Sequence, residues 1–192
     1  MPQSWKNMHE EWKAMLNKPK NLALKTGTGV GKAVEAVIAA EDEFRKEPGA
    51  GYPALVHTLD ALSQKCKETK DKFKLFTDAG KLLDTIGLRA TARKAEAKTA
   101  VNNTLDTIKH HCDSAIAELK SAGPDRDKAG EHWIAFKREL EIGLCTGYPK
   151  LQDSVKVIEA MLPPNHKDSK QDLFNFPAAI GRLKEAANAG RV

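Results

Sequence analysis

A glycine-rich stretch followed by lysine, Gly-Thr-Gly-Val-Gly-Lys at 27–32, is the first place in this sequence where chemistry could be expected. In a phosphate-binding loop, backbone amides and the lysine hold the phosphates, and a serine or threonine follows the lysine to bind magnesium. Here Ala33 follows the lysine, and Thr26 stands where that loop has its first glycine. We therefore expect no nucleotide cofactor here.

The run His110-His111-Cys112-Asp113 brings together four side chains that can bind a metal ion. Neighbours on a helix point about 100° apart, whereas a helix supplies ligands to one ion from spacings of three or four residues. We expect Cys112 in the core, both histidines outside, and neither metal nor cofactor. No nucleophile stands in a recognisable pattern with a base, so we expect no catalytic residues and no enzyme activity. An enzyme or ligand-holding bundle is a minor alternative.

A lysine-rich run offers a different kind of site. The chain has a formal net charge of +5, and Phe73 and Phe76 accompany the run. Lysines interleaved with aromatic residues suit nucleic acid or an anionic surface. Glu68 and Asp71 interrupt the run, which favours a solvated helix face, so anion binding is an alternative interpretation. The lysines concerned are Lys65, Lys67, Lys70, Lys72 and Lys74.

The sequence Gly-Tyr-Pro-x-Leu occurs twice, with Tyr52-Pro53 in the first half and Tyr148-Pro149 in the second. Proline suits the first turn of a helix, where its missing N–H is not needed, and the tyrosine can pack back on that turn as a staple. The alternative is that these two corners form a paired recognition surface for another protein.

The elements that position these residues are predicted to be helices. Apolar residues recur every three or four positions, and no stretch shows the alternation of apolar and polar residues that is typical of a strand. Ser4 is a suitable N-cap for the first helix, and Pro19 ends it. The alanine- and lysine-rich segment 90–100 favours a helix that joins the two halves. We expect helices over 4–17, 30–46, 53–76, from about 79, 91–121, 126–143, from 149, and 177–189.

The two halves of the chain resemble each other. When 27–55 is aligned without gaps to 123–151, an offset of 96, 11 of the 29 positions are identical, against roughly two expected from background residue frequencies. The sequence predicts an all-α protein built by tandem duplication of an antiparallel helical unit of about 96 residues, with pseudo-two-fold symmetry. The units would cover 1–96 and 97–192, packed as two domains or as one globule.

Composition bounds the remaining questions. No apolar run reaches the roughly 18 residues of a membrane-spanning helix, the N-terminus lacks the apolar core of a signal peptide, and three dispersed cysteines suit reduced thiols. These features predict a cytoplasmic protein. By exclusion, we expect a non-catalytic protein-binding or scaffold protein that can also self-associate. Trp5 and Trp12 leave a membrane-surface first helix as an alternative, which Glu10 and Glu11 weaken.

Overall fold

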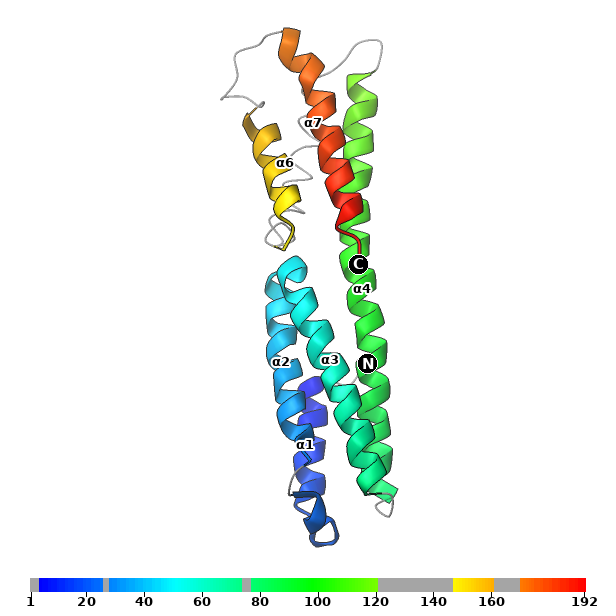
Figure 1. The fold of residues 1–192 in the computed structure, drawn as a ribbon. Coiled ribbons are helices and arrows are strands. Elements are labelled where there is room, and N and C mark those ends of the chain that lie inside the picture. Colours follow the sequence, from blue (N-terminus) through cyan, green and yellow to red (C-terminus); the bar gives the residue numbers. More distant parts are fainter. Residues whose placement is uncertain (1–3, 26–27, 74–76, 121–146, 161–169) are drawn as a thin grey trace. The chain divides into compact units, whose positions relative to one another are not determined.

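The computed structural model describes residues 4–25, 28–73, 77–120, 147–160 and 170–192 (Figure 1). Every regular element in these ranges is a helix, which confirms the all-α prediction for the described part of the chain. The chain divides into two compact units. Unit 1 consists of Met1–Arg45 and Gly51–Ala97, and unit 2 of Lys46–Ala50 and Lys98–Val192.

Unit 1 begins with two helices that match their predicted ranges. Helix α1 spans Trp5–Leu16, and the Oγ of Ser4 caps it by accepting a hydrogen bond from the N–H of Asn7 at 3.2 Å. A short 3-10 helix, η1, covers Pro19–Lys25 and was not predicted. Helix α2 spans Val30–Lys46.

Helix α3 spans Pro48–Lys72, so the prediction that it begins at Pro53 is wrong. Pro48 takes the first helical position, where a missing N–H has no cost, and one residue, Glu47, separates α3 from α2. Pro53 lies inside α3 and removes one backbone hydrogen bond, the one its N–H would have donated to the carbonyl of Gly49.

Helix α4 spans Thr77–Leu119 without a break. The two segments predicted from about 79 and over 91–121 are therefore one helix, which confirms the prediction that a helix over 90–100 joins them. The many good helix formers between 90 and 100 explain the continuity. Residues up to Ala97 belong to unit 1 and those from Lys98 onward to unit 2.

The helices of unit 1 pack antiparallel to their sequence neighbours. Lys70 and Lys94, near opposite ends of the contact between α3 and α4, pair with Asp84 and Asp60 at 2.6 and 2.8 Å. A Cβ placed on Gly31 of α2 would lie 3.4 Å from the indole of Trp12 on α1. The core between the helices is formed by buried apolar side chains: Trp5, Met8, Trp12, Met15, Leu24, Val30, Val34, Val37, Phe44, Leu55, Leu59, Leu62, Leu83, Ile86 and Ala90.

Unit 2 contains the remainder of α4 together with α6 (Pro149–Ala160) and α7 (Lys170–Ala189). Asp113 and Asp106 of α4 pair with Lys184 of α7 and with Arg191, which shows that α7 runs antiparallel to α4. Among the described residues of unit 2, the buried apolar side chains include Val101, Leu105, Ile108, Cys112, Ala115, Leu151, Ile158, Ile180, Leu183 and Ala187.

Two predictions about unit 2 have different outcomes. The last helix was predicted to begin at 177, but α7 begins at Lys170 and continues through Pro177. A proline within a helix removes one backbone hydrogen bond, and here the helix continues past it. The helix predicted over 126–143 lies outside the described residues.

Glycine at position 51 lets α2 and α3 approach each other. A Cβ there would lie 2.6 Å from the Cα of Phe44, against backbone that cannot move aside. We expect Gly51→Ala to lower the free energy of unfolding by about 1–3 kcal/mol, as overpacking does. In contrast, a Cβ on Gly80 would meet nothing within 4 Å, so Gly80→Ala should raise it by about 0.5–1 kcal/mol. Urea denaturation of both variants checks this, and changes of the same sign would contradict it.

Candidate functional site

An open groove lies between α3 and α4 in unit 1, with a volume of about 380 Å³. Its lining runs from Ser63 to Asp71 on α3 and from Leu83 to Thr91 on α4. Each stretch covers about 12 Å of helix at 1.5 Å per residue. The groove therefore presents a strip that is two helical turns long, with polar side chains along its edges.

Leu88 is the feature of this groove that packing within the chain does not explain. It is 73% exposed, whereas the other exposed large apolar residues described, Val157 and Val192, are 40% and 36% exposed. Sequence reasoning missed Leu88, although a signal was available: it lies between Ile86 and Ala90, both buried, and so falls outside the apolar spacing of α4.

The charges beside Leu88 are partly neutralised. Lys70 donates hydrogen bonds of 2.7 and 2.6 Å to the two carboxylate oxygens of Asp84. Lys67 is exposed, and among the described residues no carboxylate lies within ion-pair distance of it. The groove thus offers one exposed apolar side chain, one available cation, and one available carboxylate, Asp71, which is exposed and has no ion-pair partner among the described residues.

A thiol at the base of the groove is chemically quiet. Cys66 is buried, and burial, with a smaller contribution from the charge of Asp84, raises the pKa of its thiol to about 12. Since the thiolate is the nucleophile, almost none of the reactive form is present at neutral pH. The groove is therefore suited to binding rather than to covalent chemistry through Cys66.

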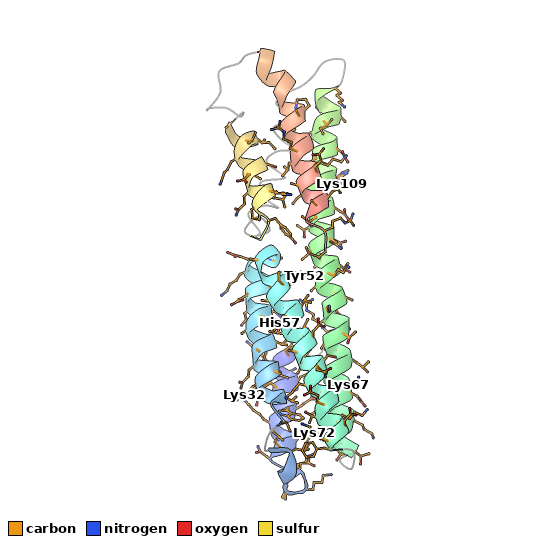
Figure 2. All side chains as sticks on the ribbon, in the orientation of Figure 1. Lys32, Tyr52, His57, Lys67, Lys72 and Lys109 are labelled. Carbon is orange, nitrogen blue, oxygen red and sulfur yellow. The ribbon has the colours of Figure 1, made fainter. Side chains whose placement is uncertain are left out.

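The structure distributes the lysines of the predicted anion-binding run over different faces of α3. Lys67 and Lys70 line the groove with α4, whereas a Cβ on Gly29, next to α2, would lie 2.9 Å from the Cε of Lys65. Lys65 and Lys70 are each paired with an acidic residue. Lys67 and Lys72 lie in the last part of α3 (Figure 2). Lys74 lies outside the described residues.

The two tyrosine–proline corners occupy different helical positions. Tyr52 is half-buried near the start of α3 (Figure 2), followed by the exposed Pro53 within that helix. Tyr148 is also half-buried, but Pro149 is the first residue of α6. A Cβ on Gly190 would lie 3.1 Å from the ring of Tyr148, so this ring packs against the end of the chain.

Other residues that could have formed a site are dispersed. Cys112 is buried, as its position on the apolar face predicts, while His110 is exposed. Within the described ranges, no three acidic, histidine or cysteine side chains are grouped to hold a metal ion. Lys32 of the glycine-rich stretch is exposed on α2. No helix that the structure describes is both long and apolar enough to cross a membrane.

The described residues form an all-helical fold with an open groove between α3 and α4. The chain matches none of the protein-family models, curated proteins or solved structures with which it was compared.

Proposed function

We propose that this chain is a non-catalytic helical protein that binds another protein through the groove between α3 and α4. The observation that carries the proposal is the exposure of Leu88 beside that groove. Burying a leucine side chain contributes about 1.5–3 kcal/mol, and a partner that covers Leu88 would gain that amount. The inert thiol of Cys66 also supports binding over catalysis.

The partner we propose is an acidic amphipathic helix of another protein. Two antiparallel helices offer a groove into which a third helix can lay its apolar face. A strip of two turns accommodates one such contact, with an apolar side chain of the partner against Leu88. Lys67, which has no carboxylate within ion-pair distance in the described part of the chain, would pair with an acidic residue of the partner one turn away.

A synthetic acidic amphipathic helix, with leucines at spacings of three and four, is the probe for this proposal. We expect it to bind the full chain saturably in fluorescence anisotropy, and Leu88→Glu to weaken binding about tenfold or more, because the apolar contact is lost and like charges meet. Lys67→Glu should weaken it as well, more so at low salt.

Val157→Glu is the matched control, since it places the same acidic side chain at another exposed apolar position, on α6. It should leave the affinity unchanged. Equal loss in both variants, or equal binding of a scrambled peptide of the same composition, would contradict the proposal. A single-stranded oligonucleotide tests the anion-binding alternative: binding that falls steeply with salt and competes with the peptide would favour nucleic acid. If the chain self-associates and the self-associated form no longer binds the peptide, a second copy of the chain would be favoured as the occupant of the groove.

We further propose that the chain arose by tandem duplication and retains approximate two-fold symmetry between 1–96 and 97–192. Besides the sequence identities, shared burial supports this: at four pairs of matched positions, both residues are buried. The pairs are Trp5 and Val101, Trp12 and Ile108, Leu55 and Leu151, and Leu62 and Ile158.

The cytoplasm is the compartment we propose. Cys66 and Cys112 are free thiols in the described part of the chain, which suits a reducing environment. A cytoplasmic location also gives the groove access to soluble protein partners.

A further inference from the structure

A second pocket in unit 1, with a volume of about 370 Å³, lies among α1, α2 and α4. Four cationic side chains line it: Lys6 from α1, Arg45 from α2, and Arg89 and Arg93 from α4. Three carboxylates, Glu41, Asp42 and Glu96, also line it. We propose that this arginine pocket binds a phosphate group carried by a small molecule.

Two of the carboxylates are already engaged. The Nε and Nη2 of Arg93 donate hydrogen bonds of 2.7 and 3.0 Å to the two oxygens of Glu41, whose side chain is 5% exposed. Glu96 accepts from Nη1 of Arg89 at 2.9 Å, and Nη1 of Arg93 lies 3.4 Å from its other oxygen. These bonds orient both guanidinium groups within the pocket. With four cationic and three acidic side chains in its lining, the pocket keeps a small net positive charge.

Three donors remain for a ligand. The Nε of Arg89 is buried and has no hydrogen-bond partner among the described residues. Lys6 and Arg45 are exposed, and no described carboxylate lies within ion-pair distance of either. An unsatisfied buried N–H is costly, so a ligand that accepts a hydrogen bond from Arg89 would remove an existing penalty.

The chemistry of these donors fits a phosphate better than a neutral or cationic ligand. Guanidinium groups present several N–H donors in a fork that matches the oxygens of phosphate. Ser4, Trp5 and Lys6 at the start of α1 line the same pocket, so the first-turn amides add partial positive charge. Asp42, which has no cationic partner in the described part of the chain, disfavours a ligand of high negative charge and thus limits it to a single phosphate.

Isothermal titration calorimetry of the full chain with inorganic phosphate and with phenyl phosphate tests the inference. We expect saturable binding of one equivalent, and a loss of about tenfold or more in Lys6→Gln/Arg45→Gln, the effect of losing charge-assisted contacts. These two side chains are exposed, so the fold should survive, and circular dichroism checks it. Arg89→Lys keeps the charge but removes Nε, and should weaken binding severalfold.

The matched control is Lys32→Gln/Lys81→Gln, which removes the same charge from exposed positions of unit 1 outside the pocket. It should bind phosphate like the unaltered chain. If both double variants bind phosphate equally weakly, the loss is due to the lower net charge of the protein and not to the pocket, and the inference is overturned. No saturable binding of either phosphate would also overturn it. So would binding only to vesicles containing phosphatidic acid, because a lipid headgroup would then be the ligand.

Discussion

Replacing Arg93 by methionine is expected to lower the free energy of unfolding by about 3–5 kcal/mol, because the change leaves a buried carboxylate without its partner. The carboxylate is that of Glu41, which accepts two hydrogen bonds from Arg93 and is 5% exposed. The variant also loses the contact between the guanidinium and the ring of Phe44, whose centroid lies 5.6 Å from Cζ. Chemical denaturation followed by circular dichroism measures the loss.

The neighbouring residue supplies the control. Lys94 pairs with Asp60 at 2.8 Å, but the two side chains are 42% and 59% exposed, so Lys94→Met should cost no more than about 1 kcal/mol. In addition, the double variant Arg93→Met/Glu41→Leu should recover most of the loss, because a well-packed apolar pair can replace a buried ion pair. Equal losses for Arg93→Met and Lys94→Met, or no recovery in the double variant, would mean that the pair is not responsible.

We expect Trp12→Ala to be similarly destabilising, by about 3–5 kcal/mol, the usual cost of removing a buried aromatic side chain. Trp12 is 1% exposed, and its indole packs against the backbone of α2 at Gly31. Removing the indole leaves a cavity between α1 and α2. Because α2 already touches the ring at Gly31, the helices have little room to move together and close that cavity. Urea denaturation followed by tryptophan fluorescence and circular dichroism measures the change.

Leu88→Ala is the control for this variant, since Leu88 is 73% exposed and its truncation should change stability by less than about 0.5 kcal/mol. The same experiment addresses the membrane-surface interpretation of α1. If the indoles served to bind a membrane surface, Trp12→Ala would retain full stability and lose binding to anionic vesicles. That result would mean that the core position of Trp12 contributes little.

Helix positions could largely be predicted from sequence where a local signal marks the end. Ser4 and the apolar spacing after it predict α1 to within a residue, and α2 coincides with its predicted range. The start of α3 was misplaced because two prolines, Pro48 and Pro53, both suit the first turn of a helix, and no local signal in the sequence chooses between them.

The sequence also carried a signal for the buried ion pair that spacing alone could have revealed. Glu41 follows Val37 by four residues and precedes Phe44 by three, so it lies on the apolar seam of α2. Arg93 holds the same kind of position in α4, between Ala90 and Ala97. Opposite charges on the seams of two helices indicate a buried pair, although which residues pair depends on the tertiary arrangement.

Other features of the sites could not be predicted in this way. The arginine pocket combines Lys6, Arg45 and Arg89 from three helices far apart in the sequence. Nothing local marks them as neighbours. By contrast, the division of the lysine run was predictable: residues two apart, such as Lys65 and Lys67, point about 200° apart around a helix.

The antiparallel packing of sequence neighbours in unit 1 has a consequence for how the protein is made. A linker of one residue between α2 and α3 makes their pairing entropically inexpensive. Helices α1 to α3 can therefore associate as they emerge during synthesis. The groove and the arginine pocket both need residues of α4, as far as Thr91 and Glu96 respectively. A nascent chain consequently acquires both proposed binding sites only when unit 1 is almost complete, so we expect a fragment that ends before α4 to bind neither proposed ligand.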